Sequence, residues 1–243
     1  MTRRRWIADL VSGDQAFLLG KNADHLSRVL RARLGEQFEI ATPTGVRLGE
    51  IVDIQPERVV FATRELPQIA ADQHAVTIDL YLAIFKFDRF EWAIEKCTEI
   101  GVSRIIPMIA HRTDAHLASA AQRRVQRWRR IAHEAAQQSR RDTAPEITEP
   151  AKLDRVIGNA RGKAIVLAEN EREQKLTNVV DVSSELSLAV GPEGGWTEVE
   201  LSLLNQSGWS AASLGRNILR AETAAIVGLA IAHSKEIIPP PIT

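Results

Sequence analysis

Two glycine-containing segments near the C-terminus have the residue types and spacing of a ligand-binding site. Gly191-Pro192-Glu193-Gly194-Gly195 follows one apolar, strand-like run, and the segment 214–224 follows another. Each segment precedes a stretch with a helical pattern. If the two strands are adjacent and parallel, their ends bring main-chain N–H and C=O groups together at one edge of a sheet, where open α/β proteins bind ligands. The sequence therefore predicts a pocket built largely from main-chain groups.

The composition of the first segment favours a tight turn that a ligand can approach closely. Its glycines can take positive φ, and Pro192 fixes φ near −65°. Thr197, with Glu200 three residues later, predicts a capping box at the start of the next helix. The chain has no phosphate-loop lysine after this turn and no G-x-G-x-x-G, so a nucleotide site of the common kinds is poorly supported. A turn with no ligand is the alternative.

The elements that must position these turns fall into two groups. Before residue 65, short β-like runs at 38–41, 46–52 and 58–63 and a helical pattern at 24–34 ending at Gly35 suggest a small β-barrel. Residues 65–75 lack periodicity and resemble a linker. Beyond them, strand-like runs (76–84, 103–110, 164–168, 186–191, 211–214) alternate with helical ones (90–100, 118–139, 198–206, 221–234). This alternation predicts a parallel sheet covered on both faces.

The overall composition indicates the class of protein and the cellular compartment. The 243 residues are 44% hydrophobic and 26% charged, as in a soluble globular protein, and 31 basic residues balance 31 acidic ones. Overall charge therefore says nothing about nucleic acid. The single cysteine, Cys97, excludes an internal disulfide, and no metal site is expected. With no run of about 18 apolar residues and no signal-peptide pattern, we expect a cytoplasmic protein without a membrane segment.

Gly-Pro-Glu-Gly-Gly at 191–195 is followed by Leu-Gly-x-x-Ile-Leu-Arg-x-Glu-Thr-Ala at 214–224. Further short motifs occur in order along the chain, at 25–31, 86–91, 96–102, 127–128, 134–141 and 145. Taken together, these motifs resemble those of the RsmE family of ribosomal RNA methyltransferases in the SPOUT superfamily. One departure is Arg216-Asn217, where the family often has Pro-Arg. Asn217 tolerates left-handed dihedrals, so a turn role would survive.

The resemblance implies both fold and activity. The implied fold is α/β: a small PUA-like β-barrel for RNA (1–70), then a SPOUT methyltransferase domain (75–243) with a deep C-terminal trefoil knot around a parallel sheet. The implied activity is methylation of N3 of a specific uridine in 16S (small-subunit) ribosomal RNA, with S-adenosylmethionine (SAM) as methyl donor. A homodimer with active sites at the subunit interface is also implied. A ribose 2′-O methyltransferase and a non-enzymatic RNA-binding assembly protein are the alternatives.

By similarity, three loops are expected to hold the cofactor, chiefly through main-chain groups and apolar side chains. The expected cofactor-binding residues are Leu167, Ala168, Glu169, Gly191, Pro192, Gly194, Gly195, Leu214, Gly215, Asn217, Ile218 and Leu219.

Arg220 and Glu222 are the candidates for catalysis because they lie next to the last cofactor loop. Uridine N3 attacks well only as its proton leaves, so a proton acceptor and a donor to the uracil carbonyls would both help. We assign Arg220 to a uracil carbonyl or a phosphate, and Glu222 to proton acceptance or orientation. Two structural roles stay open: Glu222 favoured by the dipole of the last helix, and an Arg220–Glu222 pair that fixes the turn.

Basic residues in several places suggest RNA contacts. The helix expected around 122–141 combines an apolar stripe with an arginine-rich face, which suits phosphates but also suits a solvated surface. Lys96 could instead pair with Glu99. Tryptophans at 6, 92, 196 and 209 are expected in the core. The RNA-binding candidates are Arg3, Arg4, Arg28, Arg31, Lys86, Lys96, Arg112, Gln138 and Arg141.

Overall fold

The computed structural model describes residues 5–65, 76–180 and 185–234. The chain forms two compact units, Met1–Ala71 with His133–Ala144, and Asp72–Ala132 with Pro145–Thr243. The C-terminal end of the long helix α4 (Val125–Gln138) is thus grouped with the N-terminal unit. Arg3, Arg4 and the expected linker at 66–75 lie outside the described residues. Among the helices that are described, none is long and apolar enough to cross a bilayer.

The N-terminal unit is a curled, half-open barrel of mixed strands. Its sheet order is β1-β4-β5-β6-β3-β2, with β1 parallel to β4 and the other neighbours antiparallel. A bulge between Ile51 and Asp53 interrupts the β5–β6 register and helps the sheet to curl. Trp6, Leu26 and Phe61 are fully enclosed in its core. The strands are β1 (Trp6–Ile7), β2 (Leu10–Ser12), β3 (Gln15–Leu19), β4 (Gln37–Thr42), β5 (Gly45–Gln55) and β6 (Arg58–Glu65).

The helix predicted at 24–34 is wrong in its bounds. Helical structure instead comprises α1 (Gly20–Asp24) and a π-helical turn at His25–Val29. It stops because Arg31 takes a left-handed φ of 53°. Gly35, at φ 81°, lies in the turn before β4 and not at a helix end.

The second unit is built on the predicted parallel sheet. Its order is β10-β8-β7-β12-β11-β13, with β9 beside β8, and every pairing is parallel. The central strands β7 and β12 are largely apolar because both faces are covered. The exceptions include the buried Asp79, which pairs with Arg104 and Arg161. The strands are β7 (Thr77–Ala83), β8 (Arg104–Ile109), β9 (Glu146–Ile147), β10 (Ala151–Lys152), β11 (Lys163–Leu167), β12 (Glu185–Val190) and β13 (Ser210–Ala212).

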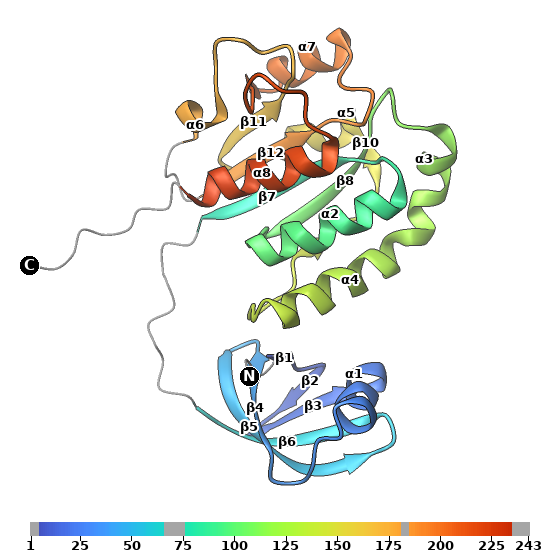
Figure 1. The fold of residues 1–243 in the computed structure, drawn as a ribbon, viewed down its shortest axis with the longest axis vertical. Coiled ribbons are helices and arrows are strands. Elements are labelled where there is room, and N and C mark those ends of the chain that lie inside the picture. The colour runs from blue at the N-terminus through green and yellow to red at the C-terminus, as the bar shows by residue number, and fades with distance from the viewer. Residues whose placement is uncertain (1–4, 66–75, 181–184, 235–243) are drawn as a thin grey trace, which may run out of the picture. The chain divides into compact units, whose positions relative to one another are not determined.

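Helices cover the two faces of this sheet and enclose separate cores (Figure 1). α2 (Phe87–Ile100), α4 (Val125–Gln138) and α8 (Ala221–His233) enclose the larger core, and α5 (Leu153–Val156) and α7 (Glu198–Gln206) the other. From β13 at the sheet edge the chain returns to α8, which packs on α2, β12 and β7. The predicted knot depends on this return. The other helical segments are α3 (Ala115–Ala121), α6 (Leu176–Val179) and 3-10 turns at Gln122–Arg124 and Ile157–Asn159.

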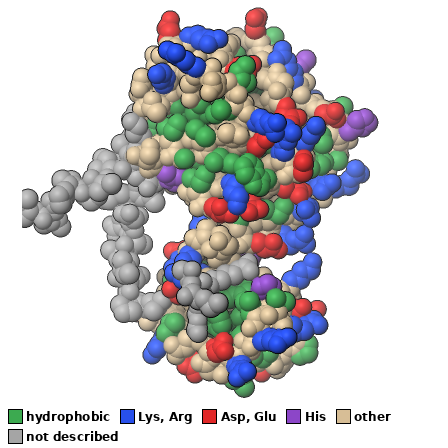
Figure 2. All heavy atoms as spheres, viewed as in Figure 1, with side chains coloured by type: hydrophobic (Ala, Val, Ile, Leu, Met, Phe, Trp, Pro, Cys, Tyr) green, Lys and Arg blue, Asp and Glu red, His purple; other side chains and the backbone are tan. Residues whose placement is uncertain are grey.

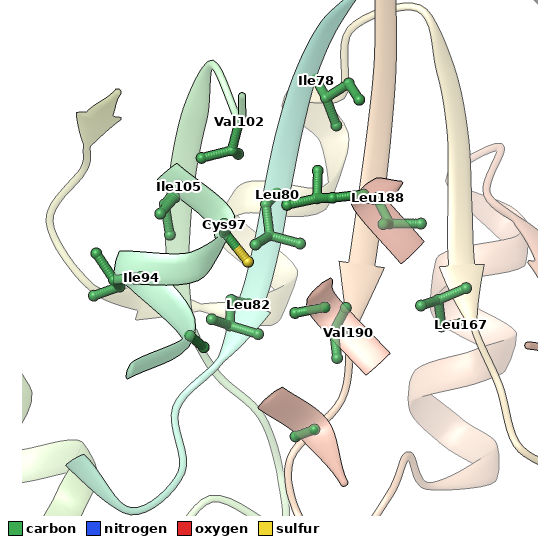
Figure 3. Close-up of a cluster of buried hydrophobic side chains, with 14 of the residues drawn as sticks. Ile78, Leu80, Leu82, Ile94, Cys97, Val102, Ile105, Leu167, Leu188 and Val190 are labelled. Carbon is green, nitrogen blue, oxygen red and sulfur yellow. The ribbon is translucent and has the colours of Figure 1, made fainter. Parts of the chain in front are cut away.

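Cys97 lies in the larger core, between α2 and the β-strands (Figure 3). Its neighbours there include Leu80, Leu82 and Ile94. Burial strongly raises the pKa of the Cys97 thiol, because a thiolate would lose its hydration. The thiol therefore stays protonated and serves as a small apolar side chain.

In the second unit, several predicted helix boundaries agree with the structure and one predicted helix does not. α2 ends at Gly101, which takes a left-handed φ of 116°, and Thr197 and Glu200 form the predicted capping box of α7. The single helix predicted at 118–139 is wrong: it is α3, a 3-10 turn and α4, ending at Gln138. Arg140, with φ 60°, follows that end, so Arg141 is not on the helix.

The α7 cap also fixes the loop after β8. Glu200 is buried, and its carboxylate accepts hydrogen bonds from the N–H groups of His111 (2.7 Å) and Thr197 (2.9 Å). We expect Thr197→Ala to lower the free energy of unfolding by about 1 kcal/mol. Glu200→Ala should cost more, roughly 2–3 kcal/mol, because it removes charge-assisted bonds and leaves a donor unpaired. Urea unfolding measures both; Ser202→Ala, on the exposed face of α7, is the control. Equal losses in all three variants would contradict this account.

Candidate active site

Three chain reversals meet at the carboxyl edge of the parallel sheet, and they are the three loops that the resemblance implied. They follow β11, β12 and β13, and together they line one cavity of about 620 Å³. The predicted turns after β12 and β13 therefore share an edge. The two strands are parallel but not adjacent, because β11 lies between them and pairs with both. Because β11 lies between the other two strands, the loop that follows it lies at the centre of the site.

The loop after β12 is a tight turn tied to its neighbours by polar contacts. The N–H of Gly195 donates to the carbonyl of Pro192 (2.9 Å), and Gly195 has a left-handed φ of 70°. The indole N–H of Trp196 donates to the carbonyl of Leu167 (2.9 Å), joining this loop to the end of β11. Arg112 donates to the carbonyl of Gly194 (2.6 Å) from the other side. The turn is thus held before any ligand arrives.

The loop after β13 forms the third wall. Ala168 donates to the carbonyl of Ala212 (3.0 Å), which fixes the ends of β11 and β13 side by side. Gly215 has φ 130°, a conformation suited to glycine. Ile218 is 79% exposed at the rim, so an apolar side chain faces outward where the resemblance implies a ligand or a partner.

Most of the predicted cofactor residues line this cavity. The exception is Gly194, whose carbonyl is occupied by Arg112. The cavity-lining members of the predicted set are Leu167, Ala168, Glu169, Gly191, Pro192, Gly195, Leu214, Gly215, Asn217, Ile218 and Leu219.

The two predicted catalytic residues differ in position. Arg220 is exposed and lines the cavity, at the N-cap of α8. Glu222, in the first turn of α8, is 6% exposed and is not among the lining residues. Its Oε1 lies 3.9 Å from Nε of Arg89, which does line the cavity. The Arg220–Glu222 pair considered from the sequence is not among the ion pairs of the described residues.

Several cavity residues were not selected from the sequence. They include three arginines: Arg89, Arg172 and Arg216. Arg89 stands in the motif 86–91, but its sequence position, more than 100 residues from the glycine turns, gave no sign that it reaches them. Arg89 directly precedes the buried Phe90 at the N-terminal end of α2. This position in the helix is the one sequence feature that could have pointed to Arg89.

The RNA-binding candidates on the second unit are largely engaged within the protein. Arg112 holds the loop after β12, and Lys96 pairs with both Glu95 and Glu99 at 2.8 Å. Those glutamates raise the pKa of Lys96, chiefly through hydrogen bonds to its ammonium group. Lys86 is exposed at the start of α2.

The arginine-rich face of α4 and the turn before it is interleaved with acids (Figure 2). Arg124 and Arg127 contact Glu91 at 3.5 and 2.8 Å, and Arg129 bonds Glu149 at 2.8 Å. These pairs favour the solvated-face interpretation for much of this helix. The arginines of the cavity rim are different: Arg172, Arg216 and Arg220 have no ion-pair partner in the described part of the chain.

Candidates in the N-terminal unit are exposed or partly buried. Arg28 forms an ion pair with Asp24, and Arg31 is exposed at the end of the π-helical turn. Gln138 is exposed, whereas its neighbour Gln137 is fully buried. Burial lowers the pKa of the Arg141 guanidinium. No group of His, Cys, Asp and Glu side chains suited to a metal occurs among the residues described.

The prediction that the tryptophans at 6, 92, 196 and 209 lie in the core is wrong for one of them. Trp6 and Trp209 are buried, and Trp196 is partly buried against Gly191. Trp92, by contrast, is 46% exposed on α2. The helix presents Phe90, Ala93 and Ile94 to the core, which leaves position 92 on the outer side.

Comparison with known proteins identifies the class. Residues 72–233 match the model of the RNA methyltransferase domain, so the fold and site belong to an RNA methyltransferase. The ribosomal RNA small subunit methyltransferase E of Synechocystis is 32% identical over 214 residues (85% of this chain, 68% of the relative). That of Rickettsia conorii is 32% identical over 213 residues (85% and 84%). The chain belongs to the ribosomal RNA small subunit methyltransferase E (RsmE) family.

Solved structures agree with this placement. The enzyme of the same name from Neisseria gonorrhoeae, bound to S-adenosyl methionine, superposes with a TM-score of 0.82 at 27% identity, covering 93% of this chain and 95% of that one. A Legionella pneumophila protein solved with SAM bound gives 0.83 at 25% identity (95% and 96%). These matches confirm the predicted fold class, a curled N-terminal barrel followed by a parallel α/β domain of the SPOUT type.

The Trp196–Leu167 bond gives a direct test of how the cavity is held together. Trp196→Phe keeps the ring but removes the N–H donor, leaving the Leu167 carbonyl unpaired. We expect the free energy of unfolding to fall by about 1 kcal/mol. The control is Trp92→Phe on the exposed side of α2, which should change it by less than about 0.5 kcal/mol. Urea unfolding compares the two; a loss as large for Trp92→Phe would show that the bond is not what stabilises the loops.

Proposed function

We propose that this chain methylates N3 of a uridine in small-subunit ribosomal RNA, with SAM as methyl donor. The observation that carries the proposal is the cavity formed by the three loops after β11, β12 and β13, in a chain of the RsmE family. Its volume of about 620 Å³ is in the range of small-molecule sites. Relatives named as small-subunit ribosomal RNA methyltransferases, and structures solved with S-adenosylmethionine bound, support it.

The residues around the cavity fit SAM. Gly191, Gly195 and Gly215 line the cavity. At Gly215 no protein atom lies within 4 Å of the place a Cβ would take, so the main chain there is open to an adenosine, while Leu214 and Leu219 offer apolar surface. Glu169 supplies a carboxylate at the end of β11, where ribose hydroxyls would find an acceptor. When bound, SAM supplies a methyl group that its sulfonium sulfur already activates, so the protein contributes mainly position and electrostatics.

The unpaired arginines of the rim suit the RNA. Arg172, Arg216 and Arg220 are exposed, and without carboxylate partners among the described residues their charge is available to phosphates. Arg216 is part of the departure from the family pattern and keeps a cation at this rim. We assign Arg220 to a phosphate of the target strand, next to the methyl donor.

A homodimer completes the proposal. Ile218 and Val199 are 79% and 78% exposed, and a second copy covering Ile218 would close the cavity rim. The dimer is the commonest closed assembly of identical chains. The activity places the protein with the bacterial ribosome, in the cytoplasm.

Two measurements test the proposed function. Calorimetry should detect SAM binding at one site per chain. Mass mapping of small-subunit RNA from a strain lacking this gene, before and after treatment with the purified protein and SAM, should show one new methyl on uracil N3. A methyl on a ribose 2′-oxygen would overturn the base specificity, and absence of SAM binding would favour a non-enzymatic assembly protein.

A further inference from the structure

Two carboxylates and one arginine meet where the N-terminal ends of α2 and α8 approach the cavity. Arg89 in α2 donates from Nη1 to Glu193 Oε1 at 2.7 Å. Its Nε lies 3.9 Å from Oε1 of Glu222 in α8, too far for a hydrogen bond but close enough for charge pairing. Glu193 belongs to the loop after β12, so Arg89 joins three elements at one point.

The burial of Glu222 requires an explanation. Its side chain is 8% exposed, and Oε2 has no hydrogen-bond partner in the described structure. A buried carboxylate is costly unless a cation or several donors compensate it. Arg89 is the cation in contact with it among the described ion pairs. Glu222 therefore depends on Arg89 electrostatically, and Arg89 is drawn toward α8 by Glu222.

Arg89, unlike Glu222, faces the site. It lines the cavity, its side chain is 33% exposed, and its Nη2 donors have no partner among the described residues. A guanidinium has five N–H donors in a rigid plane, so contacts at Nη1 and Nε fix the direction of the two N–H groups at Nη2. The two glutamates thus orient these Nη2 donors toward the cavity.

The charges around Arg89 indicate what it binds. Two carboxylates surround one guanidinium, so the cluster carries a formal charge of −1 and does not favour another anion such as a phosphate or the carboxylate of SAM. A uracil carbonyl is neutral before reaction. Its oxygen gains negative charge as the N3 proton leaves. A hydrogen-bond donor held in a fixed position then stabilises this charge more than it stabilises the neutral carbonyl.

We propose that Arg89 is a catalytic residue that donates a hydrogen bond to a carbonyl oxygen of the target uracil, and that Glu222 is the positioning residue that holds it there. This assignment rests on the proposed function. Glu222 then orients and does not accept the N3 proton, because a proton acceptor must come within about 2.6–3.2 Å of the group it deprotonates. The proton passes to water in the open cavity.

Single-turnover methylation with saturating SAM and RNA tests the assignment. Arg89→Ala should slow the chemical step by roughly 10²–10³-fold, the usual loss on removing a donor to a developing oxyanion. Arg89→Lys, which keeps the charge but loses the planar donors, should be slow as well. The SAM dissociation constant from calorimetry should change by less than about threefold.

Glu222→Gln distinguishes positioning from proton transfer. It should slow the reaction, leave the shape of the rate–pH profile unchanged, and add little to Arg89→Ala in the double variant, because both act through one contact. Arg155→Ala, an exposed arginine on α5 away from the cavity, is the control and should react at the normal rate. Thermal melting establishes that each variant is folded.

Several outcomes would overturn the assignment. Loss of pH dependence in Glu222→Gln would make Glu222 the proton acceptor. A tenfold weaker SAM complex in Arg89→Ala, with the rate restored at saturation, would place Arg89 on the cofactor. Normal rates in folded Arg89→Ala would remove it from the reaction. In each case the unaltered protein still methylates N3, whereas failure of that reaction itself would refute the proposed function instead.

Discussion

The site depends on a constraint of parallel sheets: every strand ends at the same edge, so the chain reversals after β11, β12 and β13 must meet there. Helices and loops then provide the walls, and glycines such as Gly191 and Gly215 line the cavity together with apolar side chains such as Leu214. Such a surface suits a cofactor that carries its own reactivity, because the protein has to position two reactants rather than supply a nucleophile. Membership of the RsmE family accords with this division of labour.

Polar contacts between neighbouring loops keep that edge in place. The Trp196 indole bonds the end of β11, Arg112 bonds the Gly194 carbonyl, and Glu200 joins the start of α7 to the loop after β8. Each contact links a different pair of elements. A pocket held this way loses little conformational entropy when a ligand binds, which favours affinity without many direct side-chain contacts.

Local signals in the sequence predicted local structure well. The alternation of apolar and helical patterns predicted the parallel sheet, Gly101 the end of α2, and Thr197 with Glu200 the cap of α7. The two glycine turns predicted the position of the cavity, because tight turns are rich in glycine and proline and can be recognised from these residues. The β-like runs before residue 65 already suggested a small barrel. The resemblance to a family supplied the cofactor and the reaction, which periodicity cannot show.

Features that depend on distant contacts were missed. Nothing near β12 or β13 shows that β11 lies between them, because strand order is set by packing of the whole sheet. Arg89 reaches the site through the packing of α2 on α8. Glu222 is buried, and its place in the first turn of α8 does not reveal that in the sequence. The split between α3 and α4 and the exposure of Trp92 likewise follow from tertiary contacts.

Hydrogen–deuterium exchange with and without SAM tests the shared main-chain pocket most directly. The account predicts that amides of the loops at 167–169, 191–196 and 214–219 gain protection together when SAM is added, while the half-barrel strands are unchanged. Protection confined to one of these loops, or appearing elsewhere in the chain, would contradict it.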